Sequence, residues 1–147
     1  MHCRTARRSG TRGRRHVSYV LDTSALLAKV YGETGAARIE SALLGDSCFM
    51  SSVNLAEFAS KCADQGMTRA DVEIVLDGFD IEAVDFDADL ALATGVLRAS
   101  TRHLGLSLGD RACLALAQRL NATALTADRA WKAIDPALEL KIECVCD

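Results

Sequence analysis

Long apolar runs are missing from this sequence of 147 residues. No stretch approaches the roughly 18 apolar residues that a membrane-spanning helix needs, and the N-terminus lacks the apolar segment of a secretory signal peptide. The sequence also lacks internal repeats and any linker that would divide its body. These absences argue against a membrane or repeat protein. They predict one domain, which at this length can bury a real hydrophobic core.

The cysteines lack the spacing of a zinc site. They form no C-x-x-C pair and no zinc-like Cys/His arrangement, and stand at Cys3, Cys48, Cys62, Cys113, Cys144 and Cys146. Cys62 and Cys113 fall on apolar helix faces and are expected in the core. Cys144 and Cys146 end a strand-like tail, where alternation directs both side chains to one face. Since nothing else suggests a disulfide framework, we expect a reducing, cytoplasmic location.

Charge is distributed unevenly beneath a net charge of −3. Residues 1–16 hold six of the 17 basic residues and no acid. The remaining 11 basic residues stand against 20 acids, so residues 17–147 carry a formal charge of −9. The basic segment is either a nucleic-acid-binding arm or a disordered leader, which a start codon assigned too far upstream would also produce. We favour the leader, with a compact domain over residues 17–147.

Strand-like and helix-like segments alternate along residues 17–147. Strands are predicted at residues 17–21, 48–50, 81–84, 122–125 and 140–145. Helices are predicted at residues 23–31, 36–44, 52–65, 70–76, 88–101 and 110–120, with a short one at 128–134. This order indicates an α/β fold, in which helices cover both faces of a mostly parallel sheet of about five strands.

Four carboxylates stand where such a sheet would gather them at one edge. Asp22 and Asp128 each follow a predicted strand and precede a helix. Glu57 lies early in the third helix, and Asp110 opens a later one. Ligands of open α/β sheets bind outside the carboxyl ends of the strands. Acids that converge there repel one another unless a cation holds them, and Mg²⁺ prefers oxygen ligands. The pattern therefore predicts a divalent-cation site for phosphate chemistry.

Each acid also has a structural explanation. Asp22 and Asp128 occupy positions where Asp is a favoured helix cap. Ser107 and Asp110 have the spacing of a capping box. Glu57 lies opposite the apolar arc of its helix and could face water. The metal-site interpretation rests on all four acids occurring together.

The same segments resemble those of PIN-domain ribonucleases, and more closely the VapC toxins of bacterial toxin–antitoxin pairs. The resemblance rests on VLDTSALLA, SVNLAEFASK, FDADLALATGVLR, LSLGDRACLALA and LTADRAW, in the family's order and approximate spacing. It covers residues 17–145, and residues 1–16 match nothing in the family. The resemblance implies a PIN-like α/β/α sandwich and endonucleolytic RNA cleavage with Mg²⁺ or Mn²⁺. It also implies a homodimer inhibited by a VapB-like antitoxin. The metal-binding and catalytic acids would be Asp22, Glu57, Asp110 and Asp128.

Polar residues beside the acids are candidates for supporting roles. Short hydroxyls that could orient the carboxylates occur at Thr23, Ser24, Ser107 and Thr126, although capping is the simpler role for Ser107. Cationic side chains that could meet RNA phosphates occur at Arg111, Arg129 and Lys132, with solvated helix surface as the equal alternative.

Two other functions compete with a ribonuclease toxin. A catalytically silent PIN-like module would bind RNA or a protein without cutting, but all four acids are intact. The second is an aspartyl-phosphate protein, either a phosphatase or a receiver. The phosphatase needs a second Asp two residues after the first, where Ser24 stands. A receiver domain needs a Lys near a late strand end, and Thr126-Ala127-Asp128 supplies none.

Overall fold

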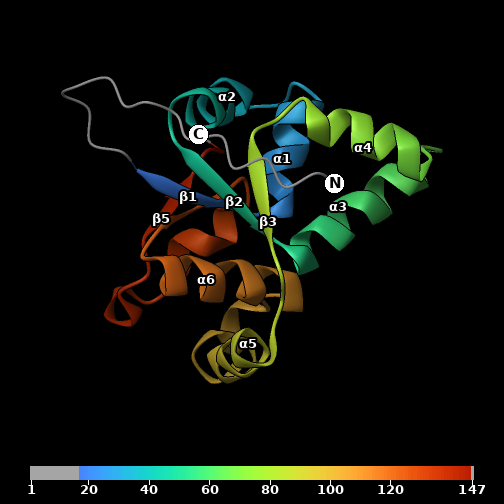
Figure 1. Ribbon diagram of the computed structural model, residues 1–147. Helices are drawn as coiled ribbons and strands as arrows, with labels where there is room; N and C mark the ends of the chain where they lie inside the picture. The colour runs from blue at the N-terminus through green and yellow to red at the C-terminus, as the bar shows by residue number, and fades with distance from the viewer. Residues whose placement is uncertain (1–16, 147) are drawn as a thin grey trace.

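The computed structural model describes residues 17–146, in which short strands alternate with helices (Figure 1). The strands are β1 (Ser18–Leu21), β2 (Ser47–Ser51), β3 (Ile81–Val84), β4 (Thr123–Thr126) and β5 (Ile142–Cys144). The α-helices are α1 (Thr23–Val30), α2 (Ala36–Gly45), α3 (Ser52–Asp64), α4 (Arg69–Asp77), α5 (Ala88–Thr101) and α6 (Leu108–Leu120). Three 3₁₀ helices are η1 (Arg102–Leu104), η2 (Arg129–Ala133) and η3 (Pro136–Leu138). The predicted leader, residues 1–16, lies outside the described residues.

The five strands form one sheet in the order β3-β2-β1-β4-β5. Every neighbouring pair is parallel, so the predicted α/β fold is confirmed and its sheet is wholly rather than mostly parallel. From β1 the chain adds β2 and β3 on one side, then returns across the sheet to add β4 and β5 on the other. The strand order therefore reverses between β1 and β4, the place where α/β sheets open a crevice at the carboxyl ends of their strands.

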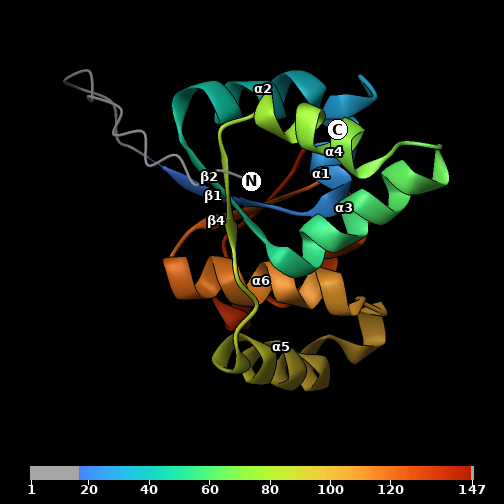
Figure 2. The same cartoon turned by 45° about the vertical axis from the view of Figure 1, so that its right-hand side comes forward.

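Helices cover both faces of the sheet, and each face has its own core. Tyr19 and Leu21 pack with Phe58 in a cluster formed with α1 to α4. Val20, between them on β1, packs on the opposite face with Trp131 and the residues of α5 and α6. Figures 1 and 2 show this division, with α1 to α4 above the sheet and α5 and α6 below it. The alternation follows from the two-residue period of a strand.

Local sequence signals explain where most helices begin. Ser51 accepts a hydrogen bond from the Val53 N–H at the start of α3. Asp87 accepts one from the Leu90 N–H at the start of α5, a position where Asp is a favoured cap. Asp87 also pairs with Arg119 of α6 at 2.9 Å, so the cap joins the two helices on the lower face. No helix among residues 17–146 is both long and apolar enough to cross a membrane.

The C-terminal segment differs from expectation in one covalent detail. Cys144 and Cys146 form a disulfide, which was not expected from the sequence. Since β5 ends at Cys144, the predicted strand alternation does not extend to Cys146. The bond depends on the approach of the two Cα atoms to 5.6 Å, within the usual range for a disulfide. Cys62 and Cys113 are buried, as the sequence predicts.

Candidate functional site

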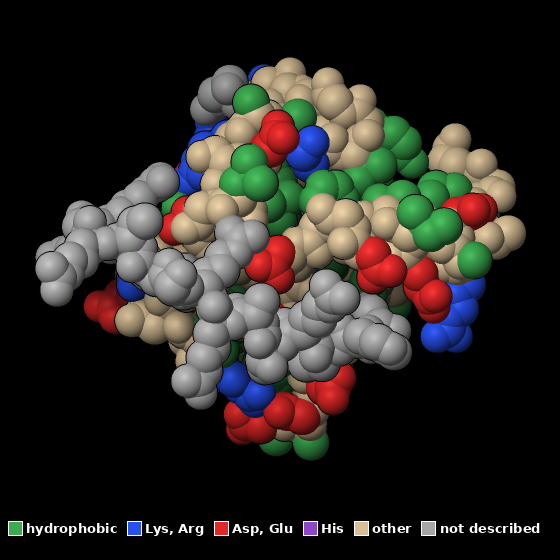
Figure 3. All heavy atoms as spheres, turned by 45° about the horizontal axis from the view of Figure 1, so that its top comes forward, with side chains coloured by type: hydrophobic (Ala, Val, Ile, Leu, Met, Phe, Trp, Pro, Cys, Tyr) green, Lys and Arg blue, Asp and Glu red, His purple; other side chains and the backbone are tan. Residues whose placement is uncertain are grey.

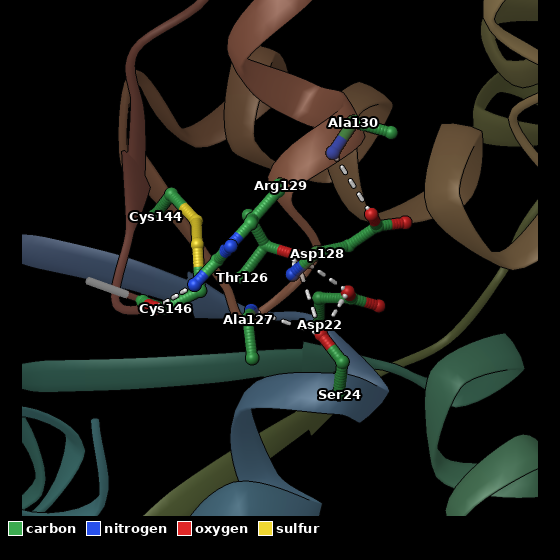
Figure 4. Close-up of a disulfide and its surroundings, with 9 residues drawn as sticks. All are labelled: Asp22, Ser24, Thr126, Ala127, Asp128, Arg129, Ala130, Cys144 and Cys146. Carbon is green, nitrogen blue, oxygen red and sulfur yellow. Dashed lines mark hydrogen bonds between the residues drawn. A yellow bond between two sulfur atoms is a disulfide. The ribbon is translucent and has the colours of Figure 1, made fainter. Parts of the chain in front are cut away.

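Asp22 lies at the reversal point of the sheet, directly after β1. Its backbone N–H donates to the Leu125 carbonyl of β4 at 2.9 Å, and its side chain is only 4% exposed. One carboxylate oxygen, Oδ2, accepts hydrogen bonds from the Ser24 hydroxyl at 2.7 Å and the Thr126 hydroxyl at 2.9 Å. Figure 4 shows these hydroxyls converging on Asp22. The predicted role of Ser24 and Thr126 in orienting a carboxylate thus has the required geometry.

Burial dominates the acid–base behaviour of Asp22. Removal from water raises the pKa of this carboxyl to about 6. The Ser24 and Thr126 hydroxyls oppose the shift by stabilising the charged form, while the negative charge of Asp110 adds to it. The carboxylate of Asp22 is therefore costly to ionise in the folded protein, and a cation placed beside it would reverse that cost.

Glu57 extends from α3 toward the first turn of α6. Its Oε1 accepts a hydrogen bond from the Asn54 side-chain amide at 3.1 Å and lies 3.5 Å from the Thr23 hydroxyl. A Cβ atom at Gly109 would overlap the Glu57 carboxylate, so the acid rests directly on the α6 backbone. The alternative in which Glu57 simply faces water therefore does not describe its position.

Asp110 is the third residue of α6, since the helix begins at Leu108 rather than at Asp110 as predicted. Its Oδ2 accepts the Ser107 N–H at 2.8 Å, and the Ser107 hydroxyl accepts the Asp110 N–H at 3.1 Å. This is the capping box that the spacing of these two residues predicts. Ser107 therefore serves the helix start, while the charge of Asp110 is close enough to act on Asp22.

Asp128 lies after β4 and caps the N-terminus of η2. Its Oδ1 accepts the Ala130 N–H at 2.9 Å, and its own N–H donates to the Thr126 hydroxyl at 3.0 Å. Because the same hydroxyl donates to Asp22, Thr126 links the backbone of one acid to the carboxylate of another. Figure 4 shows Asp128 and Asp22 on the same side of the sheet edge.

The charges of three of the acids act on one buried thiol. Burial raises the pKa of Cys113, one turn along α6 from Asp110, well above its usual value. The charges of Asp22, Asp110 and Glu57 each raise it further. The site thus combines acids from three separate elements around one buried position, and Thr126 connects Asp128 to the group.

The donor chemistry at this edge fits a hard divalent cation. Among residues 17–146, no three Asp, Glu, His or Cys side chains lie close enough to hold a metal ion as they stand. Within that part of the chain, hydrogen bonds engage Oδ2 of Asp110, Oδ1 of Asp128 and Oε1 of Glu57 and leave the second oxygen of each acid available. Carboxylate oxygens are the ligands that Mg²⁺ and Mn²⁺ prefer.

The three predicted RNA-contacting cations have different surroundings. Arg111 is 8% exposed, and its guanidinium donates to the Thr94 carbonyl of α5 at 3.0 Å. It packs the α5–α6 interface, and a phosphate contact would require it to leave that position. Arg129 is exposed beside Asp128 and donates to the Cys146 carbonyl at 3.2 Å. Lys132 is exposed on η2. An RNA contact remains a prediction for all three residues.

Two residues of the site received no role from the sequence. Asn54 is fully buried and joins Glu57 to the Gly109 carbonyl through its amide. The signal for it was the N-x-x-E spacing, which places Asn54 one helical turn before Glu57. Gly109 precedes Asp110 in the chain, and only the three-dimensional contact with Glu57 reveals why it carries no side chain.

Comparison with known proteins gives the following similarities. The sequence profile described as "PIN domain" matches residues 19–136. Among solved structures, VapBC-5 from Mycobacterium tuberculosis matches with 26% identity and a TM-score of 0.62, over 88% of this chain and 99% of that one. VapBC2 from Rickettsia felis, bound to a promoter DNA fragment, matches with 23% identity and a TM-score of 0.64, over 87% and 98%. VapBC-1 from nontypeable Haemophilus influenzae matches with 19% identity and a TM-score of 0.63, over 89% and 100%. No curated protein matches significantly.

Proposed function

Because the chain belongs to the PIN domain family, we propose that it is a divalent-metal-dependent endoribonuclease of the VapC kind, the toxin of a toxin–antitoxin pair. The observation that carries the proposal is the buried carboxylate of Asp22, which lies at the reversal point of the sheet and within electrostatic reach of Asp110. Such an arrangement of like charges is costly unless a cation stabilises it. Glu57 and Asp128 complete the proposed site.

The four acids would hold Mg²⁺ or Mn²⁺, which when bound neutralises phosphodiester charge and activates water for hydrolysis. The protein's own hydrogen bonds would hold the carboxylates in position before RNA binds. Ser24 and Thr126 hold Oδ2 of Asp22 from two elements. Thr23 and Asn54 approach the same oxygen of Glu57. Hydrogen bonds of this kind orient ligands and lower the cost of reorganisation during the reaction.

Exposed cations beside Asp128 support contact with an RNA backbone. Arg129 and Lys132 lie on η2, directly after the acid, and both are exposed. They would position phosphates without reading the base sequence.

Association with an antitoxin and with a second copy is part of the same proposal. The solved structures similar to this chain are described as VapBC or toxin–antitoxin complexes. Large apolar side chains are exposed on the side of α1, α2 and α4, namely Tyr31, Leu44 and Ile74. Figure 3 shows hydrophobic side chains gathered on the right of this face, where α4 lies. On the other side of the sheet, Leu92 and Val96 form an exposed apolar pair on α5 that suits self-association.

The proposal is tested by incubating the purified protein with RNA of mixed sequence in Mg²⁺, in Mn²⁺ and in EDTA. We expect defined cleavage products with either metal and intact RNA in EDTA. Binding to RNA without cleavage in any metal would instead favour the silent PIN-like module. Absence of both cleavage and RNA binding would overturn the proposal.

A further inference from the structure

Asn54 ties the acid of α3 to the first turn of α6. Its side chain is fully buried, and its Nδ2 donates to Oε1 of Glu57 at 3.1 Å and to the Gly109 carbonyl at 3.0 Å. The Asn54 carbonyl accepts the Thr23 hydroxyl at 3.1 Å, which adds α1 to the same contact. One residue therefore connects the beginnings of three helices around Glu57.

The orientation of the Asn54 amide follows from its partners. Both nearby partners, Oε1 of Glu57 and the Gly109 carbonyl, are acceptors, so the NH₂ group must face them. The Asn54 Oδ1 atom is left buried without a hydrogen-bond partner among the described residues. An unsatisfied buried oxygen destabilises a fold, so packing alone gives no reason for an amide at this position. The orientation is explained by the contact with Glu57.

Gly109 provides the space in which the Glu57 carboxylate lies. Any Cβ at this position would overlap the Glu57 carboxylate. Glycine is less favourable than alanine within a helix, and Gly109 lies inside α6 with an ordinary helical backbone. The absent side chain lets the carboxylate of Glu57 lie against the backbone that carries Asp110.

We propose that Asn54 and Gly109 are positioning residues that set the carboxylate of Glu57 beside Asp110 for binding a divalent cation. This inference rests on the proposed function, because it assumes that Glu57 is a metal ligand. Neither residue would itself be a ligand of the cation. Asn54 fixes the direction of the carboxylate by hydrogen bonding, and Gly109 supplies the space that the carboxylate occupies.

The Asn54 part is tested by the affinity of the full chain for Mn²⁺, measured from the free-ion signal in electron paramagnetic resonance titrations without RNA. The variants are Asn54→Leu, Glu57→Gln and both together. We expect Asn54→Leu to weaken Mn²⁺ binding by roughly 10-fold, the lower end for partners that orient a metal ligand. In the Glu57→Gln background, Asn54→Leu should cause no further loss, because the carboxylate that it orients is already gone.

The Gly109 part has a separate test that does not depend on Asn54. Gly109→Ala should weaken Mn²⁺ binding and lower the melting temperature, because the new methyl group displaces Glu57. In a Glu57→Ala background, which removes the overlapping carboxylate, Gly109→Ala should leave the melting temperature unchanged or raise it. Gly95→Ala is the matched control, since a Cβ at this helical glycine of α5 meets nothing within 4 Å.

The outcomes separate the inference from the function on which it rests. If the parent itself binds no Mn²⁺, the proposed metal site falls and this inference falls with it. If the parent binds Mn²⁺ and Glu57→Gln binds it as tightly, Glu57 is not a ligand and this inference falls alone. If Glu57→Gln weakens binding but Asn54→Leu does not, the inference alone falls. Additive losses in the double variant would also overturn it, because they would show that Asn54 acts independently of Glu57.

Discussion

The hydroxyl of Thr126 donates a 2.9 Å hydrogen bond to Oδ2 of Asp22 across the boundary between β4 and β1. Thr126 is fully buried, so its hydroxyl is shielded from water while it stabilises the ionised form of Asp22. Even so, burial prevails and raises the pKa of Asp22 to about 6. The two residues show a site in which local hydrogen bonds only partly offset the cost of a buried charge.

The first prediction follows from that cost. The folded-state pKa of Asp22 lies above its ordinary value of 3.8, so ionisation opposes folding. Stability of the parent should fall as pH rises from about 4 through 6, by an amount on the order of 3 kcal/mol for a shift of this size. Asp22→Asn cannot ionise and should therefore melt at a higher temperature than the parent at pH 7 in EDTA. The difference should vanish near pH 4.

Thermal melts across pH 4–8 measure this effect. Asp64→Asn, at an exposed position near the end of α3, is a control with the same change in charge. Parallel curves for the parent and Asp22→Asn over the whole pH range would show that burial does not control this carboxylate. Mg²⁺ should raise the melting temperature of the parent more than that of Asp22→Asn, because the variant lacks one of the proposed ligands.

The second prediction concerns cleavage. Asp22→Asn and Asp110→Asn should each abolish RNA cleavage in Mg²⁺ and Mn²⁺, because each removes a carboxylate from the proposed cation site. The fold should persist, since the amide oxygen that Asp110→Asn introduces can still accept the Ser107 N–H of the α6 cap. Circular dichroism checks that the fold persists, and a gel-based assay checks the loss of cleavage, with Asp64→Asn as the control. Cleavage near the parent rate by either purified variant would remove the proposed mechanism.

Features that depend on residues close together in the sequence, or on the strand pattern, could be predicted from the sequence. The positions of Asp22 and Asp128 were predictable, because each follows an apolar strand and the ends of parallel strands share one edge. The capping box of Ser107 and Asp110 was predictable for a different reason, because it involves residues only three apart. Both features depend on local chemistry and on the strand pattern.

Contacts between distant segments were not predictable. Helical periodicity places Glu57 opposite an apolar arc, but it cannot show that the backbone of Gly109, 52 positions later in the sequence, lies beneath it. Arg111 looks like a surface cation by type and is instead buried against Thr94 of α5. The Cys144–Cys146 disulfide joins residues only two apart, but it too was not predictable, because it depends on a Cα–Cα distance of 5.6 Å that their spacing does not give.

The third prediction concerns residues 1–16, which lie outside the described residues. They carry six arginines, which could release counterions from RNA phosphates. We expect that deletion of residues 1–16 leaves stability, cleavage and RNA affinity unchanged, as for a leader with no role in the domain. RNA binding measured between 50 and 200 mM salt, about the range in which such contacts lose affinity steeply, checks this. A large loss of affinity with a shallower salt dependence would identify an RNA-binding arm instead.

The last prediction concerns inhibition by the proposed antitoxin. Leu26, Ile39 and Leu43 of α1 and α2 are buried in the core. Tyr31 and Leu44, at 50% and 67% exposure, are left to offer apolar surface to a partner. An amphipathic segment could bind this surface and extend an arginine to the acidic edge of the sheet, where a guanidinium pairs well with carboxylates. The arginine and the metal would then compete for Asp22, Glu57, Asp110 and Asp128.

Competition makes inhibition sensitive to metal concentration. As Mg²⁺ is titrated into the purified toxin–antitoxin complex, RNA cleavage should recover, because cation binding displaces the arginine from the acids. NaCl at matched ionic strength is the control, since screening alone also weakens charge pairs. Recovery in Mg²⁺ that exceeds recovery in NaCl supports a shared site. Inhibition that Mg²⁺ does not relieve, together with an antitoxin bound far from the acids, would instead mean that the antitoxin blocks RNA access elsewhere on the domain.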